Sequence, residues 1–455
     1  MTLVLDDAQR IALDHPLDAR LALTGPPGSG KTTILIRRAQ RAAREGLPVL
    51  LTAPGARGVA RLRTALESST DTSGIECATL AEIAFRVLRG LPAGQRGGPP
   101  GQRAGAALPP IHALDDVRAS RIFESVGARL FSLDWSEFVA SEIDPEITGL
   151  RTPQRFAAAA FRLIRKLRRA GISPDQFKEF CEKGATQFYG RTPNLAASDL
   201  IMETSSKYRD SLRADAVELA RQHAREIDLV KILVKLYRSY AVALTGRGCL
   251  TGDDALYEAA RVLDAAGNSM RSRYRVACVD DAQDATSGEL AFLRGLFGPG
   301  LAGVTLAGDP DQATRTFAGA RGDAELRASG RIELSAAYRC PAPIAALAGR
   351  GLNPNKHPPV PREGEAYALY RAPDAADEAR YVAASVKGLL ADGVLPERIA
   401  IVTRSLPAAH VYVDALLARD VPLDVAGDAS LYDFPPCKMA WPHSGRRPTR
   451  TATTI

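Results

Sequence analysis

A glycine-rich segment near the N-terminus constrains the fold of this chain more than any other feature. Residues 25–32 read GPPGSGKT and match the pattern GxxxxGK[ST] without a mismatch. The segment follows a short apolar run, LALTG at 21–25, and opens a helical pattern at 32–46. A strand that turns through glycines into a helix is the context in which this motif binds phosphate. The segment therefore predicts a nucleotide-binding α/β domain rather than a glycine-rich turn that binds nothing.

The residue types in this segment have distinct roles in phosphate binding. Glycines let backbone N–H groups turn toward phosphate oxygens, and the helix N-terminus adds a favourable dipole. Lys31 is expected to reach the β- and γ-phosphates, and the Thr32 hydroxyl is expected to ligate Mg²⁺. The predicted ATP-binding residues of the segment are Gly25, Pro26, Gly28, Ser29, Gly30, Lys31, Thr32 and Thr33.

A second segment, which is acidic, supplies the carboxylates that a P-loop ATPase needs to hold the metal and to activate water. Residues 279–284 read VDDAQD and follow an apolar, strand-like run. Asp280 is expected to hold Mg²⁺ through water, and Asp281 is expected to polarise the attacking water. Alone, such a turn is more typical of a solvated loop or a helix N-cap. Together with the P-loop, the catalytic interpretation is favoured.

The order of strand-like and helical runs indicates one α/β domain with an insertion. Strand-like runs occur at 48–54, 273–280 and 302–309, and strands that alternate with helices predict a parallel sheet. Eleven of the 21 residues from 90 to 110 are Gly or Pro, which indicates a linker. Residues 111–262 show an almost entirely helical pattern.

A second α/β pattern begins near residue 365. Its expected strands are YALYRA at 367–372, RIAIVTRS at 398–405 and a run at 422–427, with helices between them. The chain is divided accordingly into 1–90 plus 265–350 as the first α/β domain, 91–264 as a helical insertion, 351–436 as a partial second α/β domain and 437–455 as a disordered tail.

Composition excludes several classes of protein. The 59 basic and 52 acidic residues give a net charge of +7, and the last 18 residues contribute +4 of it, so charge is weak evidence for a nucleic-acid partner. The six cysteines are scattered without a CxxC pair, which argues against a zinc site or a disulfide framework. No apolar stretch of 18 residues and no basic N-terminal leader occur, so we expect a cytoplasmic protein without membrane contact.

Three further segments complete a recognisable order of motifs. They are GDPDQ at 308–312, TFAGA at 316–320 and LSAAYR at 334–339. With the P-loop and VDDAQD, the chain resembles the UvrD/Rep/PcrA family of superfamily 1 DNA helicases from residue 5 to residue 436. The resemblance implies RecA-like domains, ATP and Mg²⁺ as cofactors, and 3′–5′ movement on single-stranded or tailed duplex DNA. It also implies a role in DNA repair, with a repair or helicase–nuclease partner that stays unidentified.

The resemblance assigns roles to residues outside the P-loop. A Gln ahead of the P-loop reads adenine in the family, which maps to Gln9. The GDxxQ glutamine senses the γ-phosphate, which maps to Gln312, and the Tyr-Arg pair maps to Tyr338 on adenine and Arg339 on the γ-phosphate. The implied catalytic residues are Lys31, Asp281, Gln312 and Arg339. Without the resemblance, Tyr338 reads as a half-buried aromatic residue and Arg339 as a surface ion pair.

The chain also departs from the family pattern. Asp281 stands where the family has Glu, which withdraws the water-polarising carboxylate by one methylene. Ala53, Ala81 and Ala318 stand where the family places DNA contacts, whereas Phe317 is retained. The family-like sequence stops near residue 436, before two further motifs. We therefore expect a truncated or frame-shifted product, with a fragment or a short homologue as alternatives, and no processive unwinding by this chain alone.

A basic segment is the remaining candidate for DNA binding. Residues 151–169 hold seven basic and no acidic residues, with apolar residues near helical spacing. Arg162, Arg165, Lys166 and Arg169, together with Phe317, are the predicted DNA contacts, and a solvated helix face is an equal alternative.

The sequence leaves three hypotheses about the function of the chain. The first is an ATP-dependent DNA helicase or translocase. The second is an ATP- and DNA-binding remnant, or the motor subunit of a recombination helicase–nuclease, without autonomous unwinding. The third, an unrelated P-loop switch protein, is disfavoured by Gln312 and the Tyr338–Arg339 pair in family order.

Overall fold

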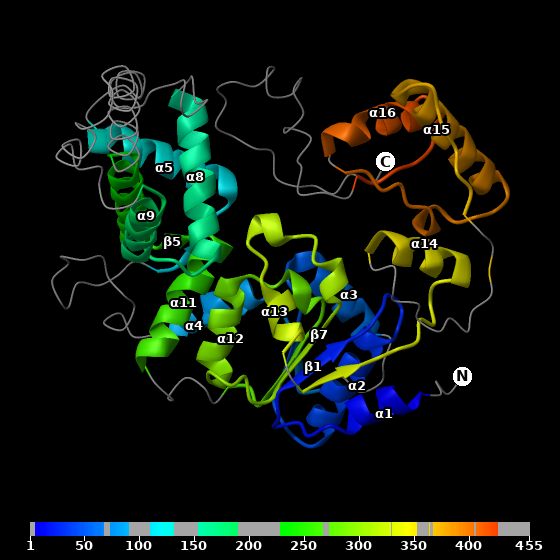
Figure 1. Cartoon of the computed structure of the whole chain (residues 1–455), viewed down its shortest axis with the longest axis horizontal. Coiled ribbons are helices and arrows are strands. Elements are labelled where there is room, and N and C mark those ends of the chain that lie inside the picture. The colour runs from blue at the N-terminus through cyan, green and yellow to red at the C-terminus, as the bar shows by residue number, and fades with distance from the viewer. Residues whose placement is uncertain are drawn as a thin grey trace, which may run out of the picture. The chain divides into compact units, whose positions relative to one another are not determined.

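The computed structural model (Figure 1) describes most of the chain. The described residues are 5–67, 73–90, 110–131, 153–189, 228–266, 273–328, 330–352, 364, 367–404 and 406–425. The chain forms two compact units, residues 1–365 and 366–455. The expected disordered tail at 437–455 lies outside the described residues, as does the linker except for its end residues.

A six-stranded parallel sheet organises the first unit, which confirms the expected fold class. The strand order is β3-β2-β6-β7-β1-β8. The strands are β1 (Leu21–Thr24), β2 (Val49–Thr52), β3 (Ile75–Cys77), β6 (Val276–Val279), β7 (Val304–Gly308) and β8 (Arg331–Glu333). Apolar runs without alternation are typical of strands that are buried on both faces.

Strand register decides which loops meet at the carboxyl edge of this sheet. Thr24 at the end of β1 lies beside Gly308 of β7 and Glu333 of β8. Thr52 at the end of β2 lies beside Val279 of β6. The loops that follow these strands therefore share one edge, which is where open α/β sheets bind ligands.

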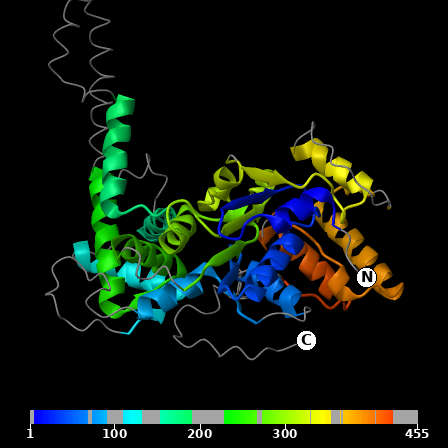
Figure 2. The same cartoon turned by 90° about the horizontal axis from the view of Figure 1, so that it is seen from below.

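Helices cover both faces of the sheet, as two views show (Figures 1 and 2). One face packs against α1 (Asp7–Asp14), α2 (Lys31–Arg44) and α3 (Ala56–Glu67). The other packs against α4 (Leu80–Gly90), α11 (Gly252–Ala266), α12 (Ser287–Phe297) and α13 (Gly322–Leu326). Within β6, Cys278 faces the first group and Ala277 the second, because successive side chains point to opposite faces of a strand.

The described residues of the expected insertion are helical, apart from one short strand pair. It contains α5 (Asp116–Phe131), α8 (Pro153–Arg169), α9 (Pro174–Tyr189) and a helix at 228–247. β4 (His112–Ala113) pairs in parallel with β5 (Cys249–Leu250). Phe123, Phe161 and Tyr240 pack together in its core, with ring centroids 5.5 to 5.9 Å apart. This core continues into the helices that cover the sheet.

The C-terminal part of the described chain differs from expectation. α14 (Ala342–Leu352) belongs to the first unit, and α15 (Ala375–Ala391) and α16 (Leu406–Leu417) form a small core in the second. The helices α15 and α16 were expected, but the described residues of the three expected strands join no ladder. Those strand predictions are wrong, because a strand needs hydrogen-bonding neighbours that no described segment provides. Leu369 and Val402 are accordingly 90% and 91% exposed.

Candidate nucleotide-binding site

Two glycines of the P-loop allow neighbouring segments to approach closely. Gly28 and Gly30 have φ angles of 78° and 91°, in the left-handed region that favours glycine. A Cβ at position 28 would lie 2.6 Å from the Cβ of Arg339, and one at position 30 would lie 2.7 Å from Nε2 of Gln9. The loop therefore brings both predicted nucleotide contacts against the turn that precedes α2.

The side chain of Lys31 is hydrogen-bonded to the backbone of its own P-loop. Its Nζ donates to the carbonyl oxygens of Gly25 and Pro26 at 2.7 and 2.9 Å. Burial lowers the pKa of Lys31, while the nearby carboxylates of Asp309 and Asp280 act in the opposite direction. An ammonium held by carbonyls alone is available to phosphate oxygens, which are stronger partners because they are charged.

Thr32 and Asp280 meet although 248 residues separate them. The Thr32 hydroxyl donates to Oδ2 of Asp280 at 2.9 Å. Burial raises the pKa of the Asp280 carboxyl, and the charge of Asp281 raises it further. A hydroxyl and a buried carboxylate are hard oxygen donors that fit Mg²⁺, which keeps several waters and few protein ligands. The described residues contain no cluster of three His, Cys, Asp or Glu side chains suited to a metal ion.

Asp281 occupies an unusual backbone conformation and has a partner that sequence reasoning missed. Its φ and ψ are 48° and 38°, in the left-handed region that Asp tolerates better than most residues. Nη2 of Arg61 donates to Oδ2 of Asp281 at 2.6 Å. The pairing of β2 with β6 places α3, which carries Arg61, beside this turn. No sequence signal marks Arg61, because the contact depends on strand order.

Gln312 belongs to a small network at the end of β7. Its Nε2 donates to Oδ2 of Asp309 at 2.7 Å. The backbone N–H of Asp309 donates to Oε1 of Gln283 at 3.1 Å, so the GDPDQ turn is fixed to the VDDAQD turn. Asp309 and Gln283 are both buried, and neither had an assigned role in the sequence analysis. The sequence signal that could have indicated these two residues is the occurrence of Asp and Gln in both motifs.

The predicted adenine contacts lie on the same side of the P-loop. Gln9 closes a capping box with Asp6 at the start of α1, and its Nε2 donates to the carbonyl of Ser29 at 3.0 Å. The Tyr338 hydroxyl donates to Oδ2 of Asp6 at 2.5 Å, and this bond raises the pKa of the phenol. The backbone N–H of Tyr338 donates to the carbonyl of Gly28 at 2.9 Å. Tyr338 is partly exposed, with its ring anchored at the mouth of the loop.

Two of the predicted DNA contacts are engaged within the protein. Arg165 donates to Asp116 at 2.7 Å and to Asp253 at 2.9 Å. Nε of Arg169 also donates to Asp253, at 2.8 Å. These ion pairs connect α8 to α5 and α11, so both arginines have a structural partner that the sequence pattern did not reveal.

The other predicted DNA contacts are exposed. Arg162 and Lys166 have exposed side chains on α8 and, among the described residues, no ion-pair partner. Phe317 lies in a short 3-10 helix, Thr316–Ala318, and is 76% exposed, as a base-stacking residue must be.

Ala53, which stands where the family places a DNA contact, is buried against Gly58, so the position has no room for an aromatic side chain.

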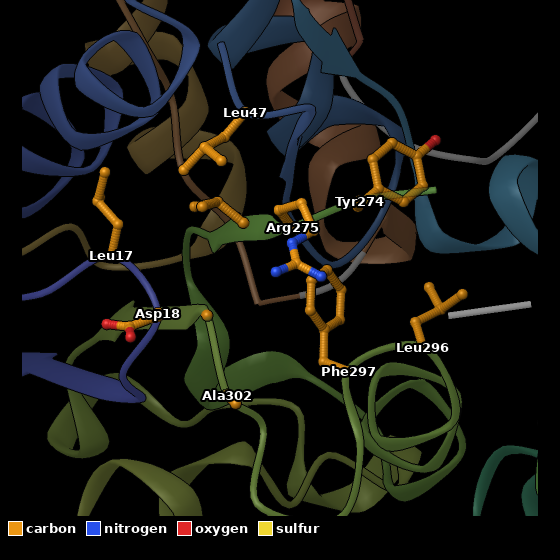
Figure 3. Close-up of a pocket in the computed structure, with 10 residues that line it drawn as sticks. Leu17, Asp18, Leu47, Tyr274, Arg275, Leu296, Phe297 and Ala302 are labelled. Atoms are coloured by element: carbon orange, nitrogen blue, oxygen red, sulfur yellow. The ribbon is translucent and has the colours of Figure 1, made fainter. Parts of the chain in front are cut away.

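A separate cavity of about 310 Å³ lies at the opposite edge of the sheet (Figure 3). Arg275 and Gly303 precede β6 and β7, so this cavity adjoins the amino ends of the strands. It contains none of the predicted site residues. Its lining consists of Leu17, Asp18, Leu47, Tyr274, Arg275, Val276, Leu296, Phe297, Ala302 and Gly303.

Comparisons with known proteins agree with this geometry. Three curated relatives match, each described as ATP-dependent DNA helicase UvrD2, one from Mycobacterium bovis and two from strains of Mycobacterium tuberculosis. Each is 28% identical over 236 residues, which cover 46% of this chain and 33% of the relative. The match thus spans about a third of the relatives' length.

Two further findings complete the comparison. Among the described residues, no helix has the length and apolarity needed to cross a membrane. The model of the UvrD/REP helicase N-terminal domain matches residues 5–331, which is more than two thirds of the chain. The chain therefore belongs to the UvrD/REP helicase family.

Proposed function

We propose that this chain is the ATP-hydrolysing motor of a DNA helicase or translocase of the UvrD type. One observation carries the proposal: Lys31, the Thr32–Asp280 pair, Gln312 and Arg339 come from four separate segments and gather at the carboxyl edge of one sheet. Family membership favours DNA as the partner. A cytoplasmic location, a role in repair and 3′–5′ movement belong to the same proposal.

The geometry suggests how ATP hydrolysis proceeds. Water attacks the γ-phosphorus, the bond to the β,γ-bridging oxygen breaks, and ADP and phosphate form. Asp281 accepts the proton of the attacking water. Lys31 and Arg339 stabilise charge on the phosphoryl oxygens, and Gln312 reads the γ-phosphate from the turn that Asp309 fixes.

Magnesium fits the same site. Thr32 and Asp280 would hold it, Asp280 through water, and the ion would neutralise phosphate charge. Burial disfavours the charged form of the Asp280 carboxyl, and a bound Mg²⁺ would stabilise that form, which supports the assignment. Asp280 would bind the ion as the deprotonated carboxylate.

The first experiment tests the nucleotide site. We expect Lys31→Ala to abolish ATP hydrolysis, because it removes the phosphate-facing ammonium while α2 remains intact. Lys231→Ala is the matched control, since Lys231 is exposed and, within the part of the chain that the structure describes, pairs with Asp228 of the same helix alone. Binding of a fluorescent ATP analogue and phosphate release are measured for both variants. Unchanged affinity and turnover in Lys31→Ala would refute the site.

A second experiment separates the helicase from its alternative. Strand displacement is measured on 3′-tailed and 5′-tailed duplexes with ATP. Unwinding of the 3′-tailed substrate alone agrees with a 3′–5′ helicase. DNA-stimulated ATP hydrolysis without strand displacement favours the motor subunit that does not unwind DNA by itself. The observation that supports this alternative is that the chain has Asp281 where the family has Glu.

A further inference from the structure

The acidic turn between β6 and α12 is held by two arginines from other segments. Nη2 of Arg61 on α3 lies 2.6 Å from Oδ2 of Asp281. Nε of Arg315 lies 3.7 Å from Oδ2 of Asp284, three residues farther along the same turn. Arg61 follows the loop after β2 and Arg315 follows the GDPDQ turn. The carboxylate that should polarise water is therefore bound to a side chain outside the nucleotide site.

This ion pair limits the use of Asp281 in hydrolysis. A carboxylate that accepts a hydrogen bond from a guanidinium group is oriented toward that partner, and one of its oxygens is occupied. Asp is also one methylene shorter than Glu, so its oxygens have little freedom to serve Arg61 and a water together. Release of Arg61 would free the carboxylate for the attacking water.

The pair is also weak enough to be broken by a competing anion. The Arg61 side chain is 72% exposed and that of Asp281 is 41% exposed. Exposed ion pairs contribute little to stability. Arg57, one helical turn earlier, is exposed as well, so this face of α3 is positive. A phosphodiester chain offers the guanidinium several charged oxygens at once.

We propose that Arg61 is a positioning residue that withholds Asp281 from the attacking water until a nucleic-acid phosphate draws the guanidinium away. The inference rests on the proposed ATPase function and adds a means by which DNA binding stimulates it. Arg61 is assigned a role through Asp281 and no contact of its own with ATP or the metal.

The test compares two arginines of the same helix. Arg61→Gln removes the ion pair, and Arg63→Gln removes an equal charge whose partners are the Cys77 carbonyl and Glu82. The turnover number and the KM for ATP are measured with and without an oligothymidylate. Arg61→Gln is expected to raise basal turnover about two- to fivefold, as loss of an exposed pair allows, with an unchanged KM. The ratio of the turnover number with the oligonucleotide to that without it should fall toward one.

The controls separate failure of this inference from failure of the proposed function. Arg61→Lys should keep basal turnover near that of the wild type, because it retains the charge, and Arg63→Gln should change neither value. If ATP hydrolysis is stimulated by DNA but Arg61→Gln and Arg63→Gln have the same basal turnover and the same stimulation, the inference is overturned and the proposed function stands. Hydrolysis by Arg61→Gln but not by the wild type supports it. Absence of hydrolysis in every protein overturns the proposed function and the inference together.

Discussion

Arg38 stabilises the contact between α1 and the P-loop helix, and its removal gives a measurable prediction. Its side chain is 0% exposed. The guanidinium donates to the carbonyls of Ala12 at 2.7 Å and His15 at 2.8 Å, with longer bonds to Leu13, Pro16 and the Thr305 hydroxyl. Burial lowers the pKa of Arg38, and among the described residues no carboxylate forms an ion pair with it. Arg38 therefore satisfies most of the carbonyl groups at the end of α1, and Arg41 adds a second hydrogen bond to the carbonyl of Leu13 at 2.9 Å.

The expected loss in Arg38→Met follows from these bonds. Methionine keeps an unbranched apolar stem, so little volume is lost. The two short charged hydrogen bonds contribute roughly 3–6 kcal/mol together. The free energy of unfolding should therefore fall by about 3–6 kcal/mol, and the KM for ATP should rise because α1 carries Gln9 and is capped by Asp6.

Urea unfolding monitored by circular dichroism measures this loss. Arg37→Met is the control, because Arg37 precedes Arg38 on the same helix and has no side-chain hydrogen bond or ion pair within the described part of the chain. Its effect should stay within about 0.5 kcal/mol. Equal stability of the two variants would contradict the role given to Arg38.

Three further predictions concern the site itself. Asp281→Glu should raise the turnover number for ATP roughly tenfold, because the longer carboxylate recovers its reach; an equal or lower value in a folded protein would count against Asp281 as the base. Phe317→Ala should weaken single-stranded DNA binding about 10- to 100-fold in fluorescence anisotropy, as loss of one stacking platform implies, and unchanged affinity would exclude Phe317 from the DNA path. Gly28→Ala should raise the KM for ATP at least roughly tenfold, because the new Cβ displaces Arg339. Gly46→Ala, at a similar φ of 75° with open space around it, should leave that KM unchanged.

Local sequence was sufficient for the parts of the site that lie within one strand–turn–helix unit. The P-loop needs glycines, a lysine and a hydroxyl at fixed spacing, so Gly28, Lys31 and Thr32 could be assigned directly. Asp280 could be paired with Thr32 because both follow buried parallel strands. The distance of 2.9 Å between Oγ1 of Thr32 and Oδ2 of Asp280 agrees with that reasoning.

Contacts that depend on strand order could not be predicted in the same way. Arg61 meets Asp281 only because β2 and β6 are neighbours, and the arginine-rich helix α3 has no feature that singles out position 61. Arg165 and Arg169 belong to a basic segment, yet Asp253 on a distant segment receives both. The strands expected at 367–372 and 398–405 show the opposite error, since a strand-like apolar run indicates a strand but supplies no hydrogen-bonding neighbour.

Phosphate release from ATP, with and without a single-stranded oligonucleotide, tests the central claim most directly. The full chain is assayed with Mg²⁺ at low ionic strength, where contacts to the DNA backbone are strongest. The geometry around Lys31, Asp280 and Gln312 predicts hydrolysis that depends on Mg²⁺ and accelerates when the oligonucleotide is added. Failure to bind ATP, or hydrolysis that the oligonucleotide leaves unchanged, would contradict the assignment of this chain as a DNA-dependent motor.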